Sequence, residues 1–170
     1  MLNTPILLIT FNRPDHVRQV LTEIRKQQPS QLFVCQDGAR EGNENDRVKC
    51  QEVRDVITEL VDWPCELHTL YQEKNLGCGP GPAAGIDWFF EHVEMGIILE
   101  DDAVPHPDFF EYASILLEKY KDDESAAFFV MRSIFVNLLC FNRLKSSKCT
   151  KCGLVVEKWK TKYYNNNVSI

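Results

Sequence analysis

The sequence predicts an α/β fold of the doubly wound, Rossmann-like type, in which a mainly parallel sheet carries helices on both of its faces. Two observations favour this class. Four short apolar runs alternate with four amphipathic segments of helical spacing, the order typical of right-handed β-α-β units. Each apolar run also ends at polar residues, as expected where parallel strands reach a ligand-binding edge.

The first unit starts near the N-terminus. Residues 5–10 (PILLIT) form an apolar run that predicts a buried strand. Pro14 then suits the first turn of a helix, and Pro29 ends that helix. One apolar face at helical spacing should pack on the sheet, and it consists of Val17, Val20, Leu21 and Ile24.

The second unit begins with residues 31–36 (QLFVCQ), which predict another buried strand. A polar loop over residues 39–46 follows. The next helix is predicted from the apolar positions Val48, Val53, Val56, Ile57 and Leu60. Residues 65–71 alternate in polarity, so we expect a third strand that is less buried than the first two.

The last two helices flank the most informative strand. A Gly- and Pro-rich loop over residues 75–82 should lead into a helix around residues 83–93. The apolar run 97–99 then predicts a strand buried on both faces. Residues 107–120 predict a final amphipathic helix.

Three consecutive carboxylates, Glu100, Asp101 and Asp102, stand at the tip of that buried strand. Like charges this close resist ionising together, so a cation should offset them. A divalent metal on a phosphate-bearing substrate is the natural candidate at the carboxyl end of a parallel strand. The alternative is a solvated acidic turn, because Asp and Glu are usually exposed.

Further polar residues follow the other predicted strands. Asn12 and Arg13 come after the first strand, Asp37 after the second, and Asn75 after the third. The carboxyl ends of parallel strands share one edge of the sheet, so these residues and the acidic triplet predict a single ligand crevice.

The charge distribution excludes one class of partner. Residues 129–170 hold eight Lys or Arg and one acid, a net of +7, so the total of −6 leaves −13 for residues 1–128. Such an acidic body argues against nucleic-acid binding, which requires a basic surface. A phosphorylated ligand would need a metal or a few well-placed cations.

Cysteine usage and hydropathy favour a cytoplasmic protein. The seven cysteines are an odd number without a disulfide framework, and no apolar run approaches the length of a membrane span. Cys149 and Cys152 form one CxxC motif, which lacks the second ligand pair of a structural zinc site.

Common nucleotide signatures are absent from the sequence. There is no GxxxxGK[ST] motif of a P-loop. Gly77, Gly79 and Gly81 resemble a dinucleotide fingerprint, but a polar approach and interrupting prolines favour a tight turn or a loop close to a ligand. The four histidines are isolated, and no Ser-His-acid set is suggested by their spacing.

Three motifs carry a family resemblance: PILLITFNRPDHV, QDGAR and GIILEDDAVPHPDFFEY. Together they resemble the donor half of GT-A fold glycosyltransferases, the family of N-acetylglucosaminyltransferase I and its bacterial relatives. The resemblance covers about residues 4–128. It implies a nucleotide-diphospho-sugar transferase that uses a UDP-sugar and Mn²⁺ (or Mg²⁺).

The resemblance also implies roles for individual residues. Asp102, the last acid of the DXD-type triplet, would ligate the metal, and Glu100 and Asp101 would shape the site through water or the sugar. Asp37 would bind the uridine. Arg13 would reach the phosphates, and the nucleotide pocket would be lined by Thr10, Phe11 and Asn12.

The resemblance divides the chain into a donor-binding core, residues 1–128, and an atypical basic segment, residues 129–170. The second segment lacks the family's acceptor-binding half and catalytic base, and its only acid is Glu157. We therefore expect a truncated, rearranged or frame-shifted gene end, with donor binding but inefficient transfer to a sugar, glycan or lipid-linked acceptor. A zinc-binding or membrane-surface tail is the competing interpretation.

Two other functions remain open. A sugar-1-phosphate nucleotidyltransferase shares this fold type but requires a Gly-rich, basic loop after the first strand, where this chain has Phe11-Asn12-Arg13-Pro14. The second alternative is a non-catalytic nucleotide-sugar-binding module or a degenerate remnant of a transferase.

Overall fold

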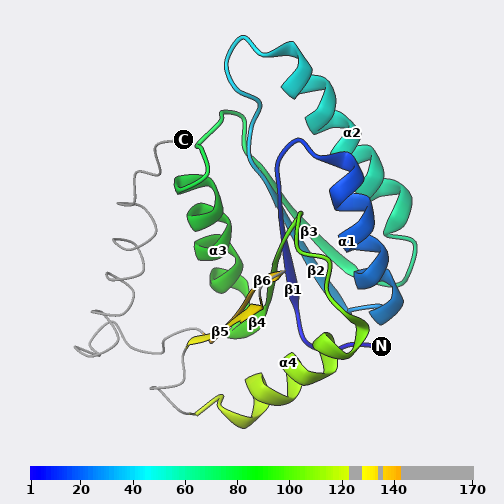
Figure 1. The fold of residues 1–170 in the computed structure, drawn as a ribbon, viewed down its shortest axis with the longest axis vertical. Coiled ribbons are helices and arrows are strands. Elements are labelled where there is room, and N and C mark those ends of the chain that lie inside the picture. The colour runs from blue at the N-terminus through cyan, green and yellow to red at the C-terminus, as the bar shows by residue number, and fades with distance from the viewer. Residues whose placement is uncertain (123–127, 134–135, 143–170) are drawn as a thin grey trace, which may run out of the picture.

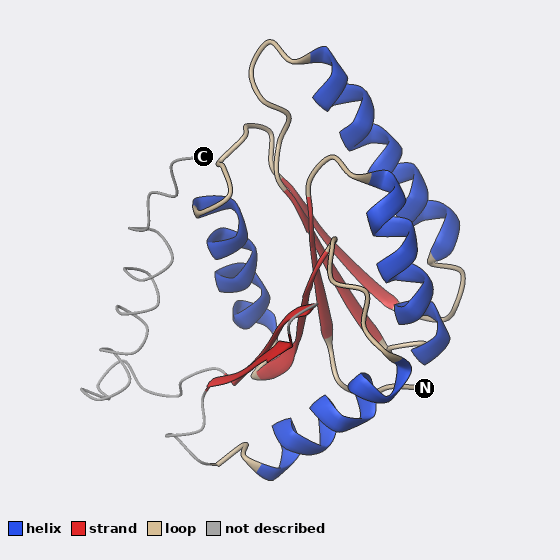
Figure 2. Ribbon diagram, in the orientation of Figure 1, coloured by secondary structure: helices blue, strands red, loops and turns tan. Residues whose placement is uncertain are grey.

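A six-stranded sheet forms the centre of the molecule (Figures 1 and 2). The computed structural model describes residues 1–122, 128–133 and 136–142. The strand order is β3-β2-β1-β4-β6-β5. The strands are β1 (Ile6–Thr10), β2 (Gln31–Gln36), β3 (Glu66–Tyr71), β4 (Met95–Glu100), β5 (Phe128–Ser133) and β6 (Val136–Asn142).

The predicted mainly parallel sheet is confirmed. β1 pairs in parallel with β2 and β4, and β2 pairs in parallel with β3. β6 is antiparallel to β4 and to β5. The carboxyl ends of β1, β2, β3 and β4 therefore lie at one edge, where the candidate site forms.

Helices cover both faces of the sheet, as predicted (Figure 2). Three of them, α1 (Pro14–Gln27), α2 (Glu44–Leu60) and α4 (Pro107–Lys119), share one hydrophobic cluster on one face. On the opposite face, α3 (Pro80–His92) packs through Phe89 on Leu7, Phe33 and Ile98.

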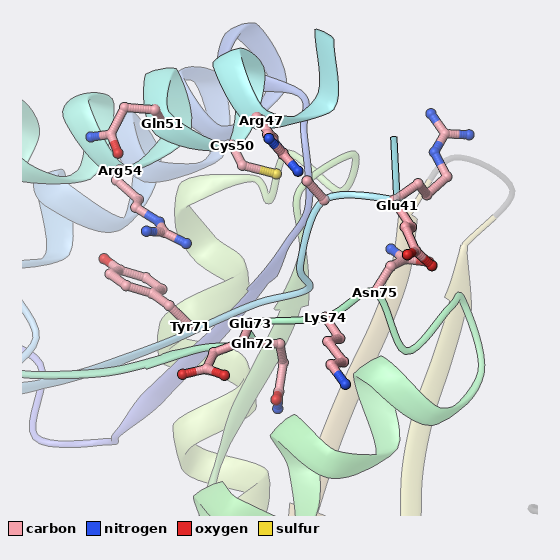
Figure 3. Close-up of a pocket in the computed structure, with 12 residues that line it drawn as sticks. Glu41, Arg47, Cys50, Gln51, Arg54, Tyr71, Gln72, Glu73, Lys74 and Asn75 are labelled. Atoms are coloured by element: carbon pink, nitrogen blue, oxygen red, sulfur yellow. The ribbon is translucent and has the colours of Figure 1, made fainter. Parts of the chain in front are cut away.

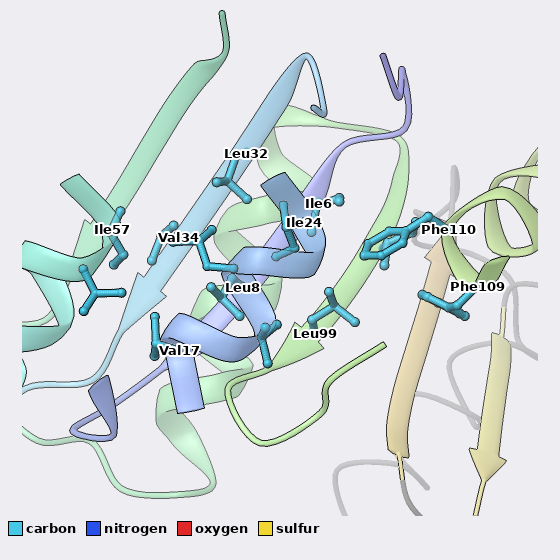
Figure 4. Packing of buried hydrophobic residues seen from close by; sticks show 14 of the residues in the cluster. Ile6, Leu8, Val17, Ile24, Leu32, Val34, Ile57, Leu99, Phe109 and Phe110 are labelled. Atoms are coloured by element: carbon cyan, nitrogen blue, oxygen red, sulfur yellow. The ribbon is translucent and has the colours of Figure 1, made fainter. Parts of the chain in front are cut away.

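Alternation along the strands explains why the apolar runs are continuous. Leu8, Val34 and Leu99 belong to the cluster of α1, α2 and α4 (Figure 4), whereas their neighbours Leu7, Phe33 and Ile98 belong to the cluster of α3. A central strand buried on both faces requires apolar residues at every position. β3 lies at the edge of the sheet and is more exposed, as predicted.

Two details of the helices differ from the prediction. Val48 is 50% exposed, because α2 turns Cys50, Val53 and Ile57 toward the sheet at helical spacing instead. α3 begins at Pro80, three residues before the predicted start at residue 83. Proline is compatible with the first helical turn, where backbone amides have no intrahelical acceptor, so part of the predicted loop 75–82 is helical.

The sheet continues past residue 128, because β5 and β6 supply its last two strands. The division into residues 1–128 and 129–170 stays a prediction. Cys149, Cys152 and Glu157 lie outside the described residues. Within the described ranges, every helix is too short or too polar to cross a membrane.

Candidate functional site

A crevice of about 370 Å³ opens at the carboxyl ends of β1, β2 and β4. Six of the eight predicted site residues line it: Thr10, Phe11, Arg13, Asp37, Glu100 and Asp101. The remaining two, Asn12 and Asp102, lie beside it and are tied to its walls by hydrogen bonds. The crevice is completed by Ile9, Cys35, Arg40, Asn75, Gly77, Cys78, Gly81 and Pro82. The parallel sheet thus brings together residues that are far apart in sequence.

Arg13 is the cation that faces the acidic triplet. Its Nε and Nη2 donate hydrogen bonds to the buried carboxylate of Asp101, and its Nη1 donates to Oδ2 of Asp102 at 3.2 Å. The predicted need for a nearby positive charge is therefore met in part by the protein itself. The side chain of Asp102 is 45% exposed, in contrast to the buried Asp101.

Negative charge remains in excess at this position. Burial raises the pKa of Glu100, and the neighbouring Asp102 and Asp101 raise it further. Burial also raises the pKa of Asp101, although the charge of Arg13 acts in the opposite direction. One guanidinium cannot balance three carboxylates, so the site favours an additional cation.

The oxygen ligands at the triplet fit Mg²⁺ or Mn²⁺. Among the described residues, no group of three or more His, Cys, Asp or Glu side chains could hold a metal ion by itself. Metals of this kind often bind through one or two carboxylates and complete their coordination with substrate phosphates and water. Asp102 is the carboxylate of the triplet that is most accessible for that role.

Asp37 holds the loop that covers one side of the crevice. Its Oδ1 accepts hydrogen bonds from the amides of Gly38 (2.9 Å) and Leu76 (2.8 Å). Its Oδ2 accepts from Nδ2 of Asn75 (2.9 Å) and from the amide of Gly77 (3.0 Å). Four donors occupy the roughly four acceptor positions of a carboxylate. The predicted contact with uridine stays a prediction, and in this conformation Asp37 positions the loop.

Asp46 is a site residue that the sequence analysis missed. It lies in the first turn of α2, within the segment predicted as loop, and is fully buried. Its carboxylate accepts hydrogen bonds from Nδ2 of Asn12 (2.7 Å) and Nη2 of Arg40 (2.9 Å). The hydrogen bond from Arg40 lowers the pKa of Asp46 to about 2. Asp46 therefore connects the loop after β1 to the loop after β2.

A sequence signal for Asp46 exists. Asn43 is the N-cap of α2, and its side chain accepts a hydrogen bond from the amide of Asp46. Asn followed three residues later by an acid is typical of a helix N-terminus. The spacing predicts the helix start, but it does not predict the contacts with Asn12 and Arg40.

Buried hydrogen bonds also hold the end of β1. The hydroxyl of Thr10 donates to the carbonyl of Cys35 at 3.2 Å. The fully buried Gln36 donates from Nε2 to the carbonyls of Phe11 (3.0 Å) and Cys50 (2.9 Å). The floor of the crevice is therefore a bonded unit built from β1, β2 and α2.

A larger cavity of about 780 Å³ lies beside the crevice, at the ends of β2 and β3. It shares Arg40 and Asn75 with the crevice but includes no member of the acidic triplet. The larger cavity therefore lies apart from the acidic triplet.

Comparison with solved structures identifies the fold. The structure of 4-diphosphocytidyl-2C-methyl-D-erythritol synthase from Anaerococcus prevotii aligns with a TM-score of 0.53 at 8% identity, over 99% of this chain and 80% of that one. The similarity supports the predicted α/β, Rossmann-like fold with a mainly parallel sheet. The similarity at this identity concerns the fold alone.

S. aureus TarS, solved over residues 1–349, is also similar, with a TM-score of 0.47 at 12% identity over 70% of this chain. This chain spans about a third (33%) of the TarS chain. No family model and no curated protein sequence matches. The specific relationship to N-acetylglucosaminyltransferase I stays a prediction.

Proposed function

We propose that this chain binds a nucleoside-diphosphate sugar, a UDP-sugar, in the crevice through a divalent metal, as a domain of the glycosyltransferase type. The observation that carries the proposal is the acidic triplet at the tip of β4, which is hydrogen-bonded to Arg13 at the crevice and keeps an excess of negative charge. A diphosphate bound with a divalent cation complements carboxylates and a guanidinium placed together.

The side chains of the site would divide the work. Asp102 would ligate Mn²⁺ or Mg²⁺, because it is half-exposed and only its Oδ2 contacts Arg13. Glu100 and Asp101 would orient water or the sugar. Thr10, Phe11 and Asn12 would line the nucleotide pocket, and Arg13 would move from its carboxylates to the phosphates. The metal, when bound, would stabilise the negative charge that develops on the leaving UDP.

One feature of the fold argues against nucleotidyl transfer. β1 ends at Thr10 and α1 begins at Pro14, so only Phe11, Asn12 and Arg13 connect them. A loop this short, without glycine, leaves no room for the backbone nest that would cradle a nucleoside triphosphate. The likeness to the diphosphocytidyl-methylerythritol synthase concerns the fold, and fold does not determine function.

The non-catalytic alternative uses the same crevice. A nucleotide-sugar-binding module or a transferase remnant would retain donor binding and lack a base for the acceptor hydroxyl. Release of UDP from a UDP-sugar, measured with and without candidate acceptors, separates these two functions. The cytoplasmic location stays a prediction.

Calorimetry of UDP binding to the intact chain, with Mn²⁺ and again with EDTA, tests the donor site. We expect saturable binding that requires the metal. Equal binding in EDTA would refute the role of the metal, and absence of binding under both conditions would refute the donor site.

A further inference from the structure

The cavity of about 780 Å³ beside the crevice has a chemistry of its own (Figure 3). It lies between α2, the loop that follows β2 and the end of β3. The crevice has an acidic side at β4, whereas this cavity is lined by four cationic side chains and two carboxylates. The cationic residues are Arg40, Arg47, Arg54 and Lys74, and the acidic residues are Glu41 and Glu73.

This concentration of positive charge is unusual for the molecule. Of the 19 Lys and Arg residues, 11 lie in residues 1–128, where the net charge is −13. Four of those 11 line this one cavity. Arg40 is paired with the buried Asp46, so the attraction for an anion rests on the other cations, above all Arg54 and Lys74.

Arg54 is held in a fixed orientation over the cavity. Its Nε donates a 2.7 Å hydrogen bond to Oε1 of Gln36, and its guanidinium lies 4.5 Å from the ring centre of Tyr71. Gln36 is fully buried and is itself fixed by two backbone carbonyls. An oriented guanidinium binds an anion at a lower entropic cost than a mobile one, because less side-chain freedom is lost.

The arginines of α1 differ from Arg54, and on α2 Nη1 of Arg47 contacts Oε2 of Glu44 at 3.4 Å. Arg18 pairs with Glu59, Arg25 pairs with Asp62, and each makes two hydrogen bonds to its carboxylate. In the part of the chain that the structure describes, no carboxylate pairs with Arg54 or with Lys74. Both cations are therefore available to a ligand.

A fixed wall separates this cavity from the crevice. Arg40 is bound to the buried Asp46, and Asn75 donates hydrogen bonds to Asp37 and to the carbonyl of Gly38 at 2.9 and 2.8 Å. Arg40 and Asn75 line both spaces. Because this wall is held by internal bonds, a ligand in one space does not require the other to be empty.

We propose that this cavity is a second ligand site, which binds the phosphate of a phosphorylated small molecule independently of the crevice. The guanidinium of Arg54 offers paired hydrogen bonds to phosphate oxygens, and Lys74 supplies further charge for a dianion. Arg47 would add to it by turning from Glu44, which it contacts at 3.4 Å across the exposed first turn of α2. The cavity is much larger than a phosphate group, so it has room for the molecule that carries it.

Titration of the ¹⁵N-labelled full chain with glucose 1-phosphate in EDTA, followed by NMR, tests the site. We expect saturable shift changes at the backbone amides of Arg47, Gln51 and Lys74. Arg47→Gln should weaken binding by about tenfold, the size of one charge-assisted hydrogen bond. Lys49→Gln is the matched control, because Lys49 lies on the same helix but not in the cavity, and binding should be unchanged.

A second pair of measurements isolates the role of Arg54 and the independence of the site. Arg54→Lys keeps the positive charge but loses the planar guanidinium that makes paired hydrogen bonds, so it should also weaken binding of glucose 1-phosphate. Saturation of the crevice with UDP and Mn²⁺ should leave glucose 1-phosphate binding intact. If UDP does not bind at all, binding of glucose 1-phosphate in EDTA still supports this second site, so the two proposals fail separately.

Three results would overturn the proposal. The first is that shift changes centre on Arg13 and Asp101. The second is that Lys49→Gln lowers the affinity for glucose 1-phosphate as much as Arg47→Gln does. The third is the absence of saturable binding. Inorganic phosphate as a second ligand distinguishes the sources of the phosphate. If inorganic phosphate binds with the same affinity as glucose 1-phosphate, the site recognises the phosphate alone. If it binds more weakly, the sugar contributes to recognition.

Discussion

Nη1 of Arg13 lies 3.2 Å from Oδ2 of Asp102, although 89 residues separate the two in the sequence. The contact exists because β1 and β4 are adjacent and parallel, so the residues that follow each strand meet at one edge. The same guanidinium also binds the buried Asp101. Arg13 is thus the internal counter-ion of the acidic triplet, and a metal with a diphosphate would have to share or replace it.

Asp102→Asn should weaken metal-dependent UDP binding by at least about tenfold, because a neutral amide is a weaker ligand for a hard cation than a carboxylate. Calorimetry with Mn²⁺ measures the effect. Asp108→Asn is the matched control, since Asp108 is a highly exposed carboxylate at the start of α4. Unchanged affinity in Asp102→Asn would contradict the assignment of the metal ligand.

Arg13→Gln should lower the free energy of unfolding, because it leaves the buried Asp101 without its counter-ion. Since Arg13 itself is half-exposed and solvent screens its charge, we expect a moderate loss of about 2 kcal/mol. Urea unfolding measures this loss. Arg18→Gln removes a similar two-bond pair with Glu59 on the surface, where solvent screens the charges, so its loss of stability should be smaller than that of Arg13→Gln.

The variant Arg13→Gln also tests whether Arg13 and the metal neutralise the same carboxylates. Without the guanidinium, the triplet has a larger excess of negative charge, so Mn²⁺ should raise the Tm of Arg13→Gln more than that of the wild type. An equal rise in both proteins would show that Arg13 and the cation act independently.

Asp46→Asn should destabilise the protein in a pH-dependent way. The native pKa of Asp46 is lowered from 3.8 to about 2, so its ionised form contributes stability above pH 3.8, and that contribution is lost as the pH falls through about 2. The Tm difference from wild type should be largest near neutral pH and should shrink in acid. Asp55→Asn, on the same helix, is the control, because Asp55 accepts a single hydrogen bond at the surface. A Tm difference independent of pH would contradict this role of the carboxylate.

Cys78 should report occupancy of the crevice. It is exposed and lines the crevice, whereas burial raises the pKa of the Cys35 thiol to about 11 and keeps it unreactive. Iodoacetamide should therefore modify Cys78 faster than Cys35, as measured by peptide mass mapping. UDP with Mn²⁺ at ten times its Kd should slow modification of Cys78 by about tenfold. An unchanged rate at Cys78 would place the nucleotide elsewhere, and the half-buried Cys65 should be unaffected.

Sequence patterns were sufficient for the architecture of the described core. The runs 32–35 and 97–99 are apolar at every position, a pattern that arises where a strand is buried on both faces. Pro14 and Pro29 marked the limits of α1 within two residues. The start of α3 was misjudged because proline and glycine are compatible both with loops and with a first helical turn.

The sequence predicted which residues would gather at this edge of the sheet, but not how they would be bonded to one another. The residues that follow parallel strands had to meet at one edge of the sheet. The shared direction of the strands was therefore enough to predict that Arg13 and Asp101 lie at the same edge. The same reasoning could not reveal that Asp37 binds its own loop, because a carboxylate at a strand end suits a ligand and a backbone amide equally well.

The sequence by itself determined the fold class and the edge of the sheet at which the predicted site residues gather, because periodicity and chain order are properties of the linear chain. Only the tertiary structure decided which charges are already paired. Arg13 binds Asp101, and Arg40 binds Asp46, whereas Arg54 is held by a neutral amide. Such pairings depend on distances of a few ångströms between segments remote in sequence, and electrostatic energies vary steeply over those distances.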